Sequence, residues 1–388
     1  MSLRGGAIRK VISVAISSLL IFASLASAAS AVAAATSGTV WSWGYNVNGR
    51  LGDGTAVNRS APIQAAALTG AIAVSAGFQH SLGLKSDGTV WAWGNNGSGR
   101  LGDGALTSRW SPTKLAGIAN TIAISAGNSH SLAVKSDGTV WAWGANGFGQ
   151  LGDGSSIREL SPKQVPGLSG IIAVAAGSDH SLVLKSDGTV WAWGLNSSGQ
   201  LGDGTTIRRS SPQQIGALSG VIGIAAGEHH SLALISDGTV STWGLNSSGQ
   251  LGDGTISSSS GPVQVTGLTS VTAIAGGGSH SLALRADGTV RAWGLNSSGQ
   301  LGDGTTLNRK TPVQPASLSG IAGISAGHAH SLAKKAIGGI VWAWGLNISG
   351  QLGDKTTTTR KTAVQVSGLS NITMVAAGYQ HNLAVRNS

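Results

Sequence analysis

The sequence predicts an all-β fold, a seven-bladed β-propeller, from three observations. A tryptophan motif recurs about every fifty residues, at Trp43, Trp93, Trp143, Trp193, Trp243, Trp293 and Trp344. The apolar runs between these motifs are short, are bounded by glycine, proline or Asp-Gly pairs, and show no helical period. The two ends of the chain are also complementary, because the last segment carries the half-unit that the first one lacks.

Each unit is expected to form a four-stranded antiparallel meander. In the third complete unit, strand A covers Ile171–Ala176, strand B covers His180–Lys185 and strand C covers Thr189–Gly194. The Asp187-Gly188 pair predicts a two-residue hairpin turn between strands B and C. Strand D is expected to start near Pro212, because proline suits an edge strand. Such meanders, repeated around an axis, form the blades of a propeller.

The ring is predicted to close through a blade that both ends of the chain share. Complete units begin near Ala71, Thr121, Ile171, Val221, Val271 and Ile321. The first tryptophan motif, from Thr39, has no strands A and B before it, whereas residues 371–386 supply strands A and B and then stop. A shared blade leaves no open sheet edge. Residues 37–388 are therefore predicted to form one closed ring, and we expect a monomer.

Residues 1–35 have the composition of an export signal peptide. Arg4, Arg9 and Lys10 form a basic start, an apolar run follows from Val11 to Leu25, and small residues suited to cleavage follow that run. We expect the mature chain to be secreted or to lie at the cell surface. The alternative is an N-terminal membrane anchor, since the uncharged stretch 11–35 is long enough to span a bilayer.

Composition excludes several kinds of site. The absence of cysteine excludes disulfides and cysteine-based metal or redox centres. The formal charge of +10 falls by three, to +7, without Arg4, Arg9 and Lys10. So modest a basic excess over a whole propeller does not predict nucleic-acid binding.

The unit AGxxHSLALKSDGTVWAWGxNxxGQLGDG resembles the repeat of the regulator of chromosome condensation family, over residues 37–388. The resemblance implies a seven-bladed propeller. Members of that family serve as nucleotide exchange factors for a nuclear small GTPase, as chromatin-associated proteins and as interaction domains. An exported bacterial β-lactamase inhibitor protein is similar in fold. Nucleotide exchange and chromatin binding are not expected here, because no unit has room for the exchange factor's extra hairpin and an export leader replaces its basic nuclear tail.

No catalytic residue is predicted, because the repeat accounts for nearly every acidic residue. Twelve aspartates recur in two kinds of turn, where aspartate bonds its own backbone, which leaves Asp179, Glu159 and Glu228 without a unique carboxylate pair. No cofactor is expected either.

Two recurring side chains are given structural roles. One histidine per unit is expected to make a hydrogen bond at the start of strand B, and the two rings of each Trp-Ala-Trp are expected to pack against the next blade. No metal site is predicted, because the histidines of adjacent blades should lie about 10 Å apart, whereas zinc needs several ligands at about 2.1 Å. The recurring histidines are His80, His130, His180, His230, His280, His330 and His381.

Binding residues are expected where the copies disagree. The pair before each recurring histidine varies freely and lies in the turn between strands A and B, on the face that also holds the connections from strand C to strand D. Loops on a rigid scaffold are where binding residues concentrate. The candidates are Phe78, Gln79, Asn128, Asp179, Glu228, His229, His328, Tyr379 and Gln380.

A second set of candidates is basic and lies further out on the same side, near the start of strand D. It comprises Arg59, Arg109, Arg158, Arg208, Arg209, Arg309, Lys310, Arg360 and Lys361. With Trp110 and Phe148, which stand outside the repeat pattern, it suggests an alternative ligand: a glycan or an anionic cell-surface polymer. The main hypothesis is a non-catalytic, exported binding scaffold for a protein or a surface polymer.

Overall fold

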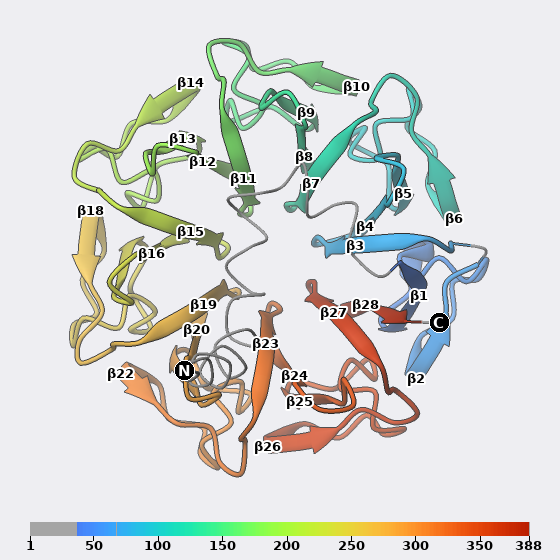
Figure 1. Cartoon of the computed structure of the whole chain (residues 1–388), viewed down its shortest axis with the longest axis vertical. Helices are drawn as coiled ribbons and strands as arrows, with labels where there is room; N and C mark the ends of the chain where they lie inside the picture. The colour runs from blue at the N-terminus through green and yellow to red at the C-terminus, as the bar shows by residue number, and fades with distance from the viewer. Residues whose placement is uncertain (1–36, 67, 388) are drawn as a thin grey trace, which may run out of the picture.

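The computed structural model describes residues 37–66 and 68–387, which form a ring of seven blades (Figure 1). The predicted signal peptide lies outside these residues. Each blade is an antiparallel sheet of four strands, A to D, from the axis outward. The prediction of an all-β, seven-bladed propeller is confirmed. No helix among the described residues has the length and hydrophobicity needed to cross a membrane.

Strands A and B follow each other in the chain and form the inner half of each blade (Figure 1). Strands A are β3 (Ala71–Ala76), β7 (Thr121–Ala126), β11 (Ile171–Ala176), β15 (Val221–Ala226), β19 (Val271–Gly276), β23 (Ile321–Ala326) and β27 (Ile372–Ala377). Strands B are β4 (His80–Lys85), β8 (His130–Lys135), β12 (His180–Lys185), β16 (His230–Ile235), β20 (His280–Arg285), β24 (His330–Lys335) and β28 (His381–Asn387).

Strands C and D form the outer half. Strands C are β1 (Gly38–Gly44), β5 (Val90–Gly94), β9 (Val140–Gly144), β13 (Val190–Gly194), β17 (Val240–Gly244), β21 (Val290–Gly294) and β25 (Val341–Gly345). Strands D are β2 (Arg59–Gln64), β6 (Arg109–Lys114), β10 (Glu159–Gln164), β14 (Arg209–Gln214), β18 (Ser259–Gln264), β22 (Arg309–Val313) and β26 (Arg360–Gln365). A 3-10 turn, η1 (Val47–Gly49), lies between β1 and β2. We number the blades 1 to 6 from β3, and blade 7 is the closing one.

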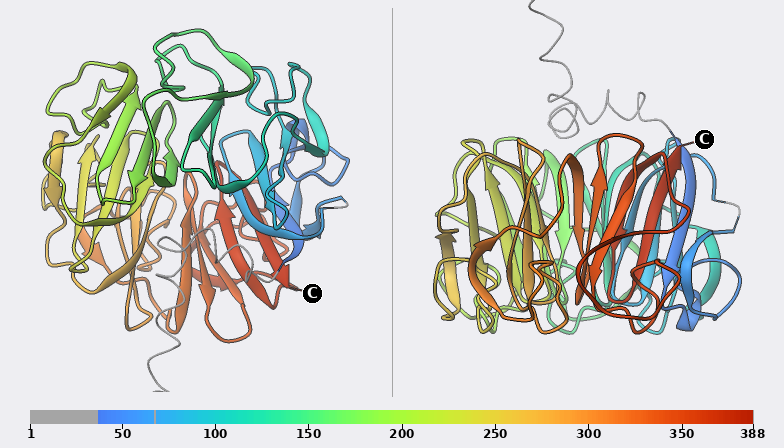
Figure 2. Two further views of the ribbon diagram at one scale, coloured as in Figure 1. Left: turned by 45° about the horizontal axis from the view of Figure 1, so that its top comes forward. Right: turned by 90° about the horizontal axis from the view of Figure 1, so that it is seen from below.

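The closing blade has the order β27-β28-β1-β2, so both ends of the chain contribute to it. Strand β28 pairs with β1 over its whole length, from Gly38 opposite Asn387 to Gly44 opposite His381. Gly38 and Asn387 therefore lie on one face of the ring, and the turns between strands A and B lie on the other. Figure 2 shows these two faces from the side, with the C-terminus on one of them. The predicted shared blade is confirmed.

Strand D begins three residues earlier than the sequence suggested. In β14, Arg209 pairs with Gly194 and Gln213 pairs with Ala192. Between these two pairs β14 contains two more residues than β13, so the strand pairing is irregular there. Pro212 lies inside this irregularity, where a missing backbone N–H removes no ladder hydrogen bond. Pro212 is therefore tolerated within the strand instead of marking its start.

The core consists of clusters that lie between neighbouring blades. The inner tryptophan of each Trp motif is fully buried, and Trp243 of blade 4 belongs to a cluster formed mainly by blade 3. The ring packs on Gly202, where a Cβ atom would come within 2.7 Å of the indole Nε1. The tryptophan thus packs against the preceding blade, and the prediction that it packs against the next one was wrong.

Candidate functional site

The recurring histidines join each blade to the next one around the ring. His180 Nε2 lies 2.9 Å from Ser231 Oγ of the following blade. Ser231 Oγ donates its hydrogen to the carbonyl oxygen of Gln200 at 2.8 Å, and Trp243 Nε1 donates to the same oxygen at 2.9 Å. Because the serine hydrogen is used in this way, the imidazole Nε2 carries the hydrogen and the serine oxygen accepts it.

This arrangement repeats through all seven blades. The His Nε2 to Ser Oγ distances are 2.8 Å for His80–Ser131, 3.0 Å for His130–Ser181, 2.9 Å for His230–Ser281, 2.9 Å for His280–Ser331 and 3.0 Å for His381–Ser81. In blade 7, Asn382 replaces the serine: its Oδ1 lies 2.7 Å from His330 Nε2 and its Nδ2 donates to Gln351 O at 2.7 Å. The expected histidine hydrogen bond is present, but it links two blades instead of fixing strand B within one.

These histidines are neutral in the folded protein. All seven are fully buried, and burial lowers the pKa to about 3 for His130, His180 and His280 and to about 4 for His230 and His330. The pKa values of His80 and His381 are lowered well below 6.5 by the same cause. Within residues 37–66 and 68–387, no group of three or more His, Asp or Glu side chains is placed to hold a metal ion.

Five of the nine predicted basic residues form ion pairs with the recurring turn aspartates. The pairs are Arg59–Asp53 at 2.7 Å, Arg109–Asp103 at 2.7 Å, Arg209–Asp203 at 2.8 Å, Arg309–Asp303 at 2.7 Å and Arg360–Asp354 at 3.0 Å. A buried asparagine of the same blade also bonds each aspartate; Asn196 Nδ2, for example, donates to Asp203 Oδ1 at 3.1 Å. These five arginines therefore stabilise the connection between strands C and D.

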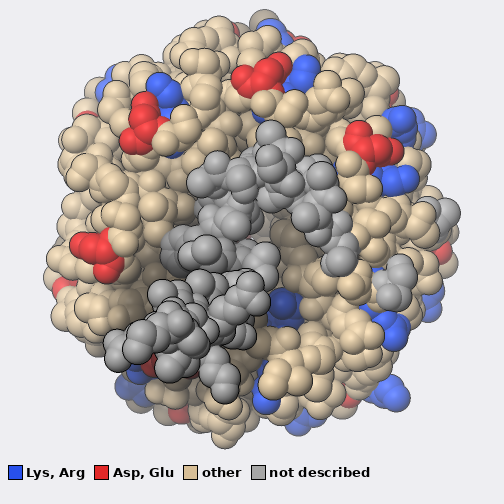
Figure 3. Space-filling view, in the orientation of Figure 1, with Lys and Arg blue, Asp and Glu red and all other residues tan. Residues whose placement is uncertain are grey.

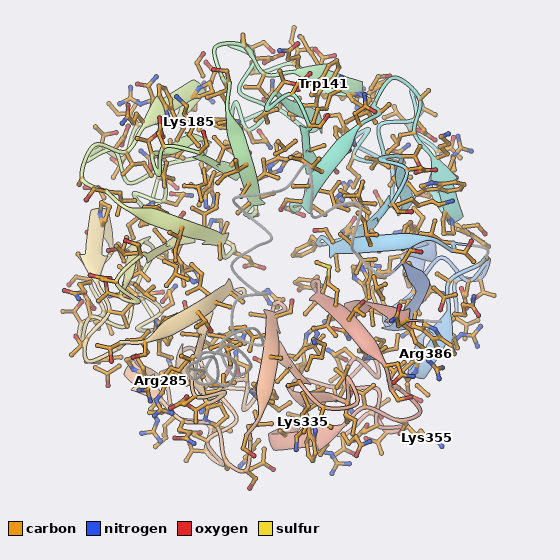
Figure 4. All side chains as sticks on the ribbon, in the orientation of Figure 1. Trp141, Lys185, Arg285, Lys335, Lys355 and Arg386 are labelled. Carbon is orange, nitrogen blue, oxygen red and sulfur yellow. The ribbon has the colours of Figure 1, made fainter. Side chains whose placement is uncertain are left out.

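The other four predicted basic residues, Arg158, Arg208, Lys310 and Lys361, are exposed. Trp110 and Phe148 are also exposed, by 51% and 42%. Figure 3 shows the opposite face, that of the turns between strands B and C, where basic and acidic side chains lie beside one another near the margin of the ring. Lys185, Arg285 and Lys355 likewise lie far from the axis (Figure 4). The four exposed basic residues belong to blades 2, 3, 5 and 6 and are therefore spread around the circumference.

The turns between strands A and B meet around the axis. We call their first residues the axial mouth: Phe78, Asn128, Ser178, Glu228, Gly278, His328 and Tyr379. Each of their backbone N–H groups donates to a carbonyl of the next blade's turn, as in Phe78 N to Gly127 O at 3.1 Å and Tyr379 N to Gly77 O at 3.2 Å. They surround a hollow of about 210 Å³. The repeat fixes the backbone of the mouth and leaves its side chains free to differ.

Four of the predicted binding residues form a continuous arc at the axial mouth. The rings of Phe78 and Tyr379 lie 3.7 Å apart between centroids, and those of Tyr379 and His328 lie 4.3 Å apart. His328 Nδ1 lies 2.5 Å from Glu228 Oε1. The arc thus joins residues from blades 1, 7, 6 and 4.

The remaining predicted residues surround the arc. Asn128 Nδ2 lies 3.5 Å from Ser178 Oγ, which donates to Asp179 at 2.9 Å. Gln79 accepts a hydrogen bond from Arg100, and Gln380 lies 3.3 Å from Ser349 Oγ. His229 occupies the second position of its turn, beside Glu228. Burial raises the pKa of Asp179.

Two arginines that the sequence analysis did not select support the axial mouth from below. Arg50 Nη1 donates to Phe78 O at 3.1 Å, and Arg100 Nη1 donates to Asn128 O at 3.1 Å. Only 2% of Arg50 and 6% of Arg100 are exposed, and this burial lowers the pKa of each guanidinium to about 10. The available signal was the replacement of glutamine by arginine in the first two Gly-Gln-Leu-Gly motifs.

A closed ring of seven blades, bonded to one another through a repeated His–Ser contact, defines a propeller built from sequence repeats. The model of the RCC1-like domain matches residues 11–316, and that of the regulator of chromosome condensation (RCC1) repeat matches residues 338–385. The chain therefore belongs to the RCC1-like family. A search of curated proteins finds no match.

Solved structures support the same assignment. Prp20p from Saccharomyces cerevisiae is 26% identical with a TM-score of 0.81, over 90% of this chain and 92% of that one; its report describes binding to Gsp1p and histones. Yeast RCC1 (Prp20), solved with Kap60 bound to it, is 25% identical with a TM-score of 0.80, over 90% and 89% of the two chains. Human WBSCR16 is 25% identical with a TM-score of 0.82, over 90% and 99%.

Proposed function

We propose that this protein is an exported, non-catalytic scaffold that recognises a protein partner through its A–B face, meaning the axial mouth and the neighbouring connections from strand C to strand D. The observation that carries the proposal is the arc of Phe78, Tyr379, His328 and Glu228, which breaks the sevenfold repeat at the axis. Aromatic residues are enriched where protein interfaces gain most of their binding energy.

Two further observations support a protein partner. Arg50 bonds the turn that carries Phe78 and Arg100 bonds the neighbouring turn of Asn128, so the Phe78 end of the arc is held in place by buried hydrogen bonds. Yeast relatives of the same fold are described with protein partners, namely Gsp1p, histones and Kap60. An anionic polymer is a less well supported ligand, because five of the nine basic candidates already form ion pairs with aspartates of this chain.

The test compares partner capture by two variants of the exported chain. The face variant carries Phe78→Ser, Glu228→Ser and Tyr379→Ser, and the control carries Asp87→Ser, Lys185→Ser and Asp187→Ser on the opposite face. We expect proteins captured by the wild type from an extract of the producing cells to be retained by the control and lost by the face variant. Equal capture by the face variant would refute the proposal.

A series of salt concentrations applied to the captured complex distinguishes binding of an anionic polymer from binding through the A–B face. Binding through Arg158, Arg208, Lys310 and Lys361 would fall steeply with added salt, because exposed charges are screened. We expect binding through the A–B face to survive 0.5 M salt and the substitution of those four residues by alanine. Loss of binding in that alanine variant, with retention in the face variant, would favour the polymer.

A further inference from the structure

The arc at the axial mouth depends on a glycine that lies between its two charged members. Glu228, Gly278 and His328 are the first turn residues of three consecutive blades, 4, 5 and 6. A Cβ atom on Gly278 would come within 2.5 Å of His328 O and 2.7 Å of His328 Nδ1. The missing side chain therefore lets His328 reach across one blade to Glu228. The three positions work as one unit.

In the part of the chain that the structure describes, Glu228 has no Lys or Arg partner, and unlike the turn aspartates that also lack one, it lies at the axial mouth. Asp53, Asp103, Asp203, Asp303 and Asp354 pair with arginines, and Asp153 and Glu159 pair with Lys163. Among the described residues, Glu228 pairs only with His328, and the nearby Asp179 pairs with no Lys or Arg. The axial mouth of a basic protein thus concentrates its unrepeated negative charge.

The hollow combines this charge with aromatic rings. Its lining includes Glu228, His328, Phe78 and Tyr379, and the Glu228 side chain is 26% exposed. The two arginines beneath the axial mouth, Arg50 and Arg100, donate to the turn carbonyls of Phe78 and Asn128 and are almost fully buried. The Glu228 carboxylate attracts a cation by its charge. The rings of Tyr379 and Phe78 follow His328 along the arc and supply apolar surface in the same hollow.

We propose that the axial hollow takes a protonated amino group on an alkyl chain, as presented by a lysine side chain of the partner polypeptide. Glu228 pairs with the ammonium group, and the rings of Phe78 and Tyr379 contact the alkyl chain. This inference rests on the proposed function of the A–B face and specifies what that face recognises at its centre.

The probes are Nα-acetyl-lysine amide, which keeps its charged ε-ammonium group, and its neutral counterpart Nα-acetyl-norleucine amide. Each is titrated into the exported chain at pH 7.5 and its binding is followed by ligand-observed NMR. We expect saturable binding of the lysine probe and binding about tenfold weaker for norleucine, the loss of one charge-assisted contact. Equal binding of the two, or no saturation by the lysine probe, would overturn the inference.

The variant Glu228→Gln keeps the size of the side chain and removes its charge, and we expect it to weaken the lysine probe about tenfold. The matched control is Glu159→Gln, which removes a carboxylate on strand β10 and should leave the probe affinity unchanged. Unchanged affinity in Glu228→Gln, with a circular dichroism spectrum like that of the wild type, would refute the role of Glu228.

Failure of this inference is distinguishable from failure of the proposed function. If the face variant loses its captured partner while the lysine probe does not bind, the A–B face is the binding face and its central ligand is not an amine. If an intact lysine-containing peptide binds but the free lysine amide does not, the inference also fails, because the hollow alone is then insufficient for recognition.

Discussion

Acidification should unfold this protein at a pH set by its ring of buried histidines. Burial lowers the pKa of these seven histidines from 6.5, to about 3 for His130, His180 and His280 and to about 4 for His230 and His330. Between these limits the unfolded chain binds a proton that the folded chain does not, so stability is fully present above pH 6.5 and is lost as the pH falls below it.

The magnitude follows from the number of histidines. Each contributes a slope of about 1.4 kcal/mol per pH unit, so the seven together contribute roughly 10 kcal/mol per unit below pH 6. That approaches the whole stability of a typical folded domain, about 5–15 kcal/mol. We therefore expect the acid unfolding midpoint to lie between about pH 4 and 6.

The carboxylates titrate in a different window. Burial opposes ionisation of Asp53, but hydrogen bonds from Arg59 and Thr55 outweigh it and lower its pKa below 3.8. A carboxylate with a lowered pKa stabilises the fold above its unfolded value and loses that effect only as the pH falls through the folded value. A loss of stability that begins near pH 6 therefore reports on the histidines.

Urea unfolding at pH 7.5, 6.5, 6.0 and 5.5, followed by tryptophan fluorescence, measures this loss. We expect the free energy of unfolding to fall with a slope that corresponds to several protons below pH 6. A wild-type slope of one proton or less between pH 6.5 and 5.5 would refute the assignment of neutral, buried histidines.

Three further predictions test the architecture. Trp193→Ala removes a fully buried ring and should cost about 3–5 kcal/mol in urea unfolding, whereas Trp191→Ala should cost much less, because Ser241 and Arg291 occupy that position in other blades. Deletion of residues after Asn371 removes β27 and β28, exposes the edge of β1 and should convert a protease-resistant chain into a sensitive one. Gly278→Val should separate Glu228 from His328 and abolish the lysine-probe binding, with circular dichroism unchanged.

The sequence predicted the strands closely where the repeat itself carried the signal. The bounds of strands A and B in the third unit agree with β11 and β12, and the shared blade follows from the complementary ends. The start of strand D was misplaced, because Pro212 was interpreted as an edge marker while the irregular pairing around it was not foreseeable from one chain.

The contacts between blades could not be predicted for a reason inherent in the repeat. A histidine and a serine, such as His180 and Ser231, stand at equivalent positions in almost every copy. The sequence therefore does not show whether a histidine bonds the serine of its own blade or that of the next blade. Only Asn382, which replaces serine in blade 7, marks one histidine's partner as different. Near-identical copies make the fold predictable, but they do not show which residues of neighbouring blades contact each other.

The opposite holds at the axial mouth, where difference between copies carries the information. Glu228, Gly278 and His328 are each unlike the other copies, and in a ring the first turn residues of neighbouring blades converge on the axis. Here three consecutive copies carry an acidic residue, a glycine and a histidine. This pattern indicates a contact that passes over the middle blade, between Glu228 and His328. Because the repeat already satisfies the backbone of every turn, such a set is not needed for folding, and this is the reason we propose a role in recognition for it.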